Sequence, residues 1–150
     1  MNVERLIRQY LAGQYHLSLA TCVENKPWVC EVHFVYDDDL NFYFLSKPSR
    51  RHSKEIAKNP NVAGNIVKQH SAKDKPRGVY FEGRAEMIDV PESHTAYKLY
   101  DERFGLGEGI RKEIKTDPAG HKFYKVIPAE FMIFDAVNFP DSPQKMWRPN

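Results

Sequence analysis

A hydroxyl and several cations gather in one short segment of the chain, and their types and order suit a phosphate group. Ser46 ends an aromatic run, a proline-containing turn follows, and Arg51 and His52 then stand where a helix should begin. Hydroxyls, free amides at a helix N-terminus and guanidinium groups are donors that proteins direct at phosphate. The segment therefore predicts a phosphate site. The plainer alternative is a solvated helix start.

The charge of the chain is nearly balanced but unevenly placed. The 150 residues carry 22 Lys and Arg against 20 Asp and Glu, a net charge of +2. Residues 47–84 alone hold ten basic and three acidic side chains. Such a local excess favours an anionic ligand: a phosphate, a nucleic acid or an acidic partner. The stretch from Lys68 to Arg77 has no interleaved aromatic residues on which single-stranded bases would stack, which argues against nucleic acid.

Length and composition exclude several classes of protein. A chain of this size folds around one core, so residues 1–150 are expected to form a single domain. The 41% hydrophobic and 13% aromatic content is too high for disorder, and no apolar run is long enough to span a membrane. The N-terminus mixes charged with apolar residues, unlike a secretory signal, so a soluble cytoplasmic protein is expected. Cys22 and Cys30 are expected to be reduced thiols, with no metal site.

Helical periodicity appears in three places around the phosphate segment. Residues 2–13 have an apolar stripe behind Asn2, a suitable N-cap. A short, mostly solvated helix follows Ser49 and ends at Asn59-Pro60. A third helix is expected from Pro91 to Gly105. The glycines at 105, 107 and 109 follow this helix and not a strand, so a dinucleotide-binding loop is not predicted.

Short strands at hairpin spacing make up most of the remaining chain. They are separated by turn residues and by a polar loop over 68–76, and Gly83 predicts a bulge within one of them. The last pair is expected to meet at Pro128, and the proline-rich residues 141–150 are expected to be irregular. This pattern favours a mainly β fold, an antiparallel β-barrel with peripheral helices. The expected strands are 16–23, 28–36, 40–45, 62–67, 79–88, 122–127 and 130–138.

Residues 17–88 resemble the flavin mononucleotide (FMN)-binding split-barrel family typified by pyridoxamine 5'-phosphate oxidase. In that family a strand ends in Thr or Ser, and a proline-containing turn leads to Ser-Arg-Lys, a short helix and Asn-Pro. Here Ser46 takes the hydroxyl position, Arg51 the arginine and His52 the lysine, before Asn59-Pro60. The resemblance implies an antiparallel split barrel in which these side chains contact the phosphate of FMN, with Ser49 or Lys54 as a further donor. Two departures are Arg50 in place of Ser and His52 in place of Lys.

The resemblance also implies which residues surround the flavin ring. The backbone of one strand would form a platform along the ring, with two residues of another strand opposite. Gly78 stands where the oxidase has a flavin-contacting glutamine, so that side-chain contact is absent. Trp147 and Arg148 are similar to a C-terminal pair that covers the flavin across a dimer interface, although a tryptophan that packs on its own barrel is the alternative. The implied ring residues are Val29, Cys30, Glu31, Val32, His33, Phe44 and Leu45.

The implied function is that of a homodimer with FMN at the subunit interface, a flavin-dependent oxidoreductase of an unidentified small molecule. No catalytic residue is assigned, because the flavin itself carries such chemistry. Oxidation of pyridoxamine 5'-phosphate is not predicted, since the residues for its phosphate are not recognisable. Two alternatives stay open: a non-catalytic flavin-binding or stress-related module, and a haem-handling split barrel, whose axial ligand one of the six histidines would supply.

Overall fold

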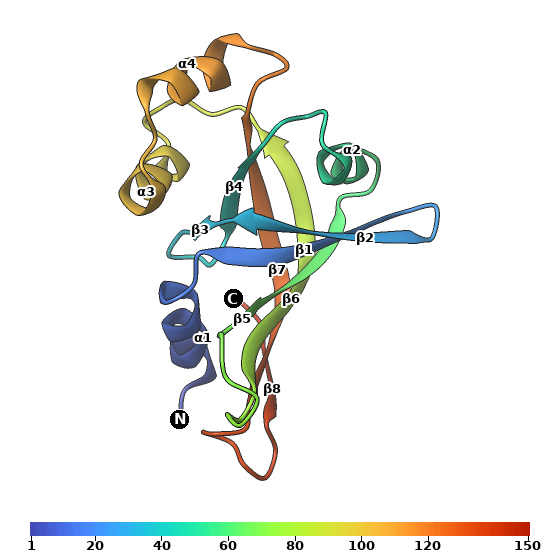
Figure 1. Ribbon diagram of the computed structural model, residues 1–150, viewed down its shortest axis with the longest axis vertical. Helices are drawn as coiled ribbons and strands as arrows, with labels where there is room; N and C mark the ends of the chain where they lie inside the picture. Colours follow the sequence, from blue (N-terminus) through green and yellow to red (C-terminus); the bar gives the residue numbers. More distant parts are fainter.

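The computed structural model describes residues 1–150, and one eight-stranded antiparallel sheet forms its centre (Figure 1). The short helices lie around this sheet rather than in a layer of their own. The strands are β1 (His16–Val23), β2 (Lys26–His33), β3 (Val35–Tyr36), β4 (Phe42–Ser46), β5 (Asn61–Val67), β6 (Arg77–Ile88), β7 (Lys122–Asp135) and β8 (Gln144–Trp147). The helices are α1 (Val3–Ala12), α2 (Arg51–Lys58), α3 (Thr95–Phe104) and α4 (Glu108–Thr116).

The sheet curls into a barrel that stays open along one seam. Its strand order is β2-β1-β5-β6-β7-β4-β3, and β8 pairs with β7. No ladder joins β2 to β4; instead Phe34, just beyond β2, packs its ring 5.6 Å from that of Phe42 in β4. Side chains therefore close the seam where backbone hydrogen bonds do not. The predicted mainly β, antiparallel split barrel is confirmed.

The predicted break at Pro128 is wrong, because β7 runs unbroken from Lys122 to Asp135. Its register with β6 shifts between Glu82 and Gly83, so that Gly83 lies opposite Pro128. A bulge of this kind accommodates a proline, which has no amide hydrogen for the ladder. A side chain at position 83 would collide with the carbonyl oxygen of Ile127. The bulge expected from Gly83 is thus confirmed, and it explains the continuous strand.

Four other features of the secondary structure differ from expectation. The predicted strand over 28–36 divides into β2 and β3. Helix α3 starts at Thr95 and not at Pro91. His94 is its N-cap, and the Nδ1 atom of His94 accepts a hydrogen bond from the amide of Ala96 at 3.1 Å. Helix α4 was not expected, because the glycines before it indicated a loop. The C-terminal residues are not wholly irregular, since β8 finds a partner in the free edge of β7.

The helices cover different parts of the barrel. α1 buries Leu6, Ile7 and Leu11 against the main core. α3 and α4 pack with β3, β4 and β7 around a second cluster of apolar side chains. α2 lies beside the β1–β2 hairpin, and β5 leads from it to the loop over 68–76 at the other end of the molecule (Figure 1). None of the helices is both long and apolar enough to cross a membrane.

Candidate functional site

A hollow of about 400 Å³ opens between the start of α2 and the β1–β2 hairpin. Three predicted phosphate donors, Ser49, Arg51 and Lys54, line it together. Lys26 of the hairpin adds a cation that the sequence did not suggest. No side chain caps the N-terminus of α2, where Arg50 is the N-cap residue. Free helix amides, a hydroxyl and three cations therefore converge and outnumber the two carboxylates of the lining, Glu24 and Glu55, so the set fits a phosphate monoester.

Arg51 is held in place from two sides. Its Nε donates to Oε2 of Glu55 at 3.2 Å, and its guanidinium carbon lies 4.0 Å from the centre of the Trp28 ring. Glu55 is itself buried and accepts a hydrogen bond from Thr21 Oγ1 at 3.2 Å. The two terminal nitrogens of Arg51 make no hydrogen bond within the chain. They stay available for an anion in a side chain that needs little further ordering.

Ser46 and His52 face each other beside this hollow rather than across it. The Oγ of Ser46 lies 2.8 Å from Nε2 of His52 and accepts from Ser53 Oγ at 3.2 Å. Ser46 is buried, so its hydroxyl reaches a phosphate only if this pair opens. Burial lowers the pKa of His52, and the charge of Arg50 adds to this effect while Glu55 opposes it. His52 is therefore mainly neutral at pH 7 and supplies less positive charge than a lysine would.

The predicted ring platform is an edge strand with alternating faces. Val29, Glu31 and His33 point outward and are exposed, whereas Val32 belongs to the buried core. β2 pairs only with β1, so the outer edge of its backbone has no partner strand. An edge of this kind offers unpaired amide and carbonyl groups to a ligand.

Cys30 and Glu31 differ in what they offer within this strand. Burial, with the nearby charges of Glu31 and Glu55, raises the pKa of Cys30 to about 11, so its thiol is protonated and unreactive at neutral pH. Glu31 stays on the surface and accepts a hydrogen bond from the hydroxyl of Ser18 across the β1–β2 ladder.

The other predicted ring residues do not line the α2 hollow within one chain, although the ring of Phe44 lies 6.1 Å from that of His52. Phe44 is fully buried, its ring stacked 5.1 Å from that of Tyr124, and Leu45 packs against the second cluster. Gly78 lies opposite Val67 in β5, towards the far end of that strand.

The C-terminal pair rests on the chain's own sheet. Trp147 packs 5.7 Å from the ring of Phe131, and Arg148 forms an ion pair with Glu130. Trp147 ends β8 and Arg148 follows it, and β8 lies away from α2 in the same chain (Figure 1). Contact between these residues and a flavin stays a prediction that requires a second copy of the chain.

A second hollow, of about 520 Å³, lies near the end of β2 and was not expected from the sequence. Its lining is mostly apolar: Ala12, Tyr15, Val35, Tyr36, Leu99, Glu102 and Arg103. Arg103 is fixed by hydrogen bonds to the carbonyl oxygens of Phe34, at 2.9 Å, and Leu11, at 3.1 Å. Beside it, the ring of His33 stacks 4.8 Å from that of Phe104.

Sequence reasoning missed Lys26, Trp28 and Glu55 in the α2 hollow. Lys26 lay in a segment with the composition of a turn, and nothing local links Trp28 to a helix that begins over twenty residues later. The signal for Glu55 was its position four residues after Arg51, a helical ion-pair spacing.

With this geometry in view, comparison with known proteins is informative. The sequence profile described as pyridoxamine 5'-phosphate oxidase matches residues 3–132. The chain belongs to the pyridoxamine 5'-phosphate oxidase family. A UPF0306 protein of Cronobacter sakazakii is 33% identical over 117 residues, which cover 74% of this chain and 80% of that relative.

Solved structures confirm the fold of the pyridoxamine 5'-phosphate oxidase family. A putative pyridoxamine 5'-phosphate oxidase from Listeria innocua aligns with a TM-score of 0.68 and 17% identity over 88% of this chain and 98% of that one. HutZ, a haem storage protein from Vibrio cholerae, aligns with a TM-score of 0.64 and 20% identity over 85% and 91%. One fold in this family thus serves proteins named for different ligands.

Proposed function

We propose that this chain binds FMN and holds the phosphate in the hollow at the start of α2. The observation that carries the proposal is the state of Arg51, whose guanidinium is fixed by Glu55 and Trp28 while its terminal nitrogens make no bond within the chain. Ser49, Lys54 and the first amides of α2 complete the donor set. Ser46 and His52 join it when the phosphate draws their side chains apart.

The flavin ring would lie along the open edge of β2, over residues 29–33. This edge supports the proposal because its backbone groups have no partner strand, and flavin carries carbonyl and imino groups at its rim. The flavin supplies redox chemistry when bound. The chain's own contribution is to orient the ring and to keep the neutral thiol of Cys30 beside it.

The outward face of the sheet supports a homodimer with FMN at its interface. Val29, Ala20 and Ala63 lie opposite one another across β2, β1 and β5, and Tyr80, Met132 and Met146 do so across β6, β7 and β8. Val29 and Met146 are 59% and 57% exposed, which is unusual for apolar side chains on a shared face. A second copy would cover this face, and Trp147 and Arg148 of one protomer would then lie near the flavin of the other.

The proposed activity is that of an oxidoreductase acting on a small organic molecule. The hollow beside His33 supports this role, because its aromatic and aliphatic lining suits a flat substrate near the end of the ring platform. Binding of FMN without turnover of any electron donor would instead mark the chain as a flavin carrier.

The test of FMN binding is the absorbance and fluorescence of the purified protein, before and after addition of FMN, with sedimentation to give the oligomeric state. Saturable quenching of flavin fluorescence by a dimer is the expected result. A monomer that leaves the fluorescence unchanged would overturn the proposal.

Haem is the second candidate, and one observation favours it. The rings of His16 and His33 stack 5.2 Å apart on the exposed end of β1 and β2, so either could act as an axial ligand. A Soret band after haem addition, lost in the double variant His16→Ala/His33→Ala, together with no response to FMN, would favour haem over flavin.

We expect the variant His52→Lys to bind FMN about three- to tenfold more tightly than the parent at pH 7.5, because a permanent charge replaces a mainly neutral imidazole. The negative phosphate should raise the pKa of His52 in the complex, so the parent takes up a proton on binding. The affinity of the parent for FMN should therefore rise as the pH falls through that pKa. The difference in FMN affinity between the parent and His52→Lys should become smaller towards pH 5.5.

Fluorescence titrations from pH 5.5 to 7.5 measure this difference. Free FMN changes its protonation with pH in the same way in both experiments. The ratio of the two dissociation constants therefore isolates the contribution of residue 52. His70→Lys is the matched control, since His70 is exposed in the loop that follows β5, at the other end of that strand from α2. A constant ratio across this pH range would show that His52 does not sense the phosphate.

A further inference from the structure

We propose a second anion site, for small phosphate esters, between α1 and the loop over 68–76. Two adjoining hollows, of about 250 and 300 Å³, meet there and share Lys68 and Arg77 in their walls. β5 separates this place from α2, since α2 precedes the strand and Lys68 follows it. The remaining lining residues are Gln69, His70, Asp74, Lys75 and Val137 in one hollow, and Leu6, Gln9, Tyr10, Gly13, Gln14 and Asn138 in the other.

The cations of this site form no direct ion pair, although the charge of Arg77 is near enough to Asp135 and Asp74 to lower the pKa of both carboxyls. None of the ion pairs in the chain includes Lys68, Lys75 or Arg77. The two carboxylates nearby are occupied by other donors. Asp74 accepts from the amide of Ser71 at 2.9 Å, and Asp135 accepts from the amide of Asn138 at 2.8 Å. Unpaired cations in a concave site concentrate anions.

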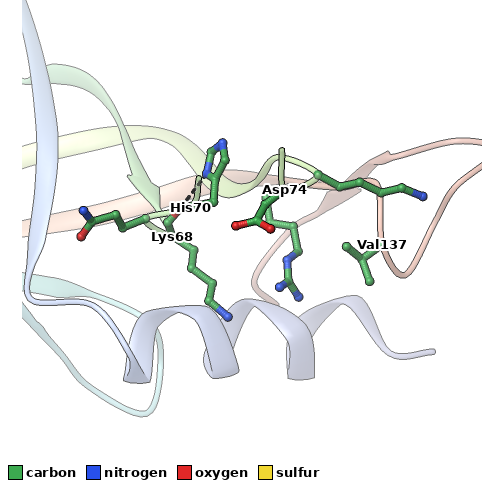
Figure 2. A pocket seen from close by; sticks show the side chains of 7 residues that line it. Lys68, His70, Asp74 and Val137 are labelled. Atoms are coloured by element: carbon green, nitrogen blue, oxygen red, sulfur yellow. Dashed lines mark hydrogen bonds between the residues drawn. The ribbon is translucent and has the colours of Figure 1, made fainter. Parts of the chain in front are cut away.

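The position of these cations is set by the fold. Arg77 begins β6, is half-buried, and lies across from Asp135 in β7 and beside the hydroxyl of Tyr10. Lys68 follows the last residue of β5, and its carbonyl oxygen lies 3.0 Å from His70 Nδ1, which fixes the turn. In Figure 2 the ammonium group of Lys68 points towards α1, the carboxylate of Asp74 faces the same hollow, and His70 turns away.

Neutral polar groups make this site more selective than a basic patch. The amides of Gln9, Gln14 and Asn138 line the part nearest α1, and Asp74 adds an acceptor. Lys68 and Arg77 suit a phosphate, while the amides and Asp74 suit the hydroxyls of the group that carries it. The hollow contains no exposed aromatic platform for nucleic-acid bases, so a small phosphate ester fits better than RNA or DNA.

The test uses the full chain saturated with FMN, or without FMN if none binds, and titrates it with ribose 5-phosphate and with inorganic phosphate. Amide chemical shifts in ¹H–¹⁵N spectra should move in residues 68–77 and in α1. Arg77→Gln should weaken ribose 5-phosphate at least about tenfold, because it removes charge-assisted hydrogen bonds. Lys73→Gln is the matched control: it removes a charge from the same loop but lies outside the lining, and should change affinity less than about twofold.

Two further variants keep the result interpretable. Lys68→Gln tests the site if Arg77→Gln fails to fold, since Lys68 is exposed. Asp74→Asn should tighten inorganic phosphate, because it removes the carboxylate that faces the same hollow. The proposal is overturned if shifts appear only around α2 and are lost in Arg51→Gln, or if Lys68→Gln and Lys73→Gln weaken binding equally. The comparison of Lys68→Gln with Lys73→Gln does not depend on whether FMN binds at α2.

Discussion

Arg51→Ala should weaken FMN binding about 10- to 150-fold, equivalent to about 1.5–3 kcal/mol for the lost charge-assisted hydrogen bonds. The size follows from how little Arg51 must rearrange, since Glu55 and Trp28 already hold its guanidinium. A freely moving surface arginine would lose much of this benefit to the entropy of ordering its side chain. The chain should still fold, because the Arg51 side chain is 50% exposed, but it should lose some stability, because the Glu55 side chain is only 10% exposed and loses its cation.

Fluorescence titration with FMN measures this change, and thermal unfolding verifies the fold. Arg5→Ala is the matched control: Arg5 is exposed on α1 and only its backbone amide forms a hydrogen bond, to Asn2. Glu55→Gln should give a smaller loss of affinity, because it loosens Arg51 without removing it. Equal affinity in Arg51→Ala and Arg5→Ala would remove the main support for a phosphate site at α2.

The phosphate segment was predictable because its geometry is local. A strand end, a turn and the first turn of a helix follow one another in sequence, so Ser49, Arg51 and Lys54 are brought together by nearest neighbours along the chain. The same holds for the N-cap Asn2, whose side chain accepts from the amide of Arg5 as the pattern of α1 indicates.

What the sequence could not predict depends on contacts between distant segments. Trp28 reaches Arg51 only because the β1–β2 hairpin extends beside α2. β7 continues through Pro128 only because Gly83 lies across from it. α4 has just Ile110 and Ile114 as apolar contacts to the second cluster, too weak a pattern to outweigh the glycines before it. Each of these features follows from tertiary pairing and not from local preference.

The two proposed anion sites explain how the +7 excess of residues 47–84 is used. On a simple basic face these side chains would all be exposed to solvent. In this fold they are divided between hollows at the two ends of β5. Arg51 and Lys54 of this segment line the α2 hollow, together with Lys26 from outside the segment, and Lys68 and Arg77 line the other. Each site should therefore respond to salt and to mutation independently of the other.

Asp135→Ala should lower the free energy of unfolding by about 3 kcal/mol, because several part-buried donors would lose their one buried acceptor at once. Asp135 has no exposed surface, and its carboxylate accepts from the amides of Val137, at 3.0 Å, and Asn138, at 2.8 Å, and from the side chain of Asn138. These bonds shape the turn that returns the chain from β7 to β8. Urea unfolding at pH 7 measures the loss, with exposed Asp141→Ala as the control.

The pH dependence of this loss identifies its cause. Burial alone would raise the pKa of Asp135, but the hydrogen bonds from Asn138 and Val137 outweigh burial and hold the pKa below its ordinary value of 3.8. The charge therefore stabilises the fold above that value, and the benefit disappears as the pH falls through the lower pKa of the folded state. The difference in free energy of unfolding between the parent and the near-isosteric Asp135→Asn should become smaller below about pH 4. A difference that stays constant with pH would show that the loss of stability comes from packing instead.

The variant Asp135→Ala also tests what holds Trp147 in place. β8 returns to β7 through the turn that Asp135 organises, and Trp147 is the last residue of that strand, packed on Phe131. A loosened turn should free β8 before the barrel unfolds, since β8 pairs with β7 alone. Tryptophan fluorescence of Asp135→Ala should then shift to longer wavelength at urea concentrations that leave the circular dichroism of the sheet unchanged. Coincident transitions would show that β8 unfolds with the barrel as one unit.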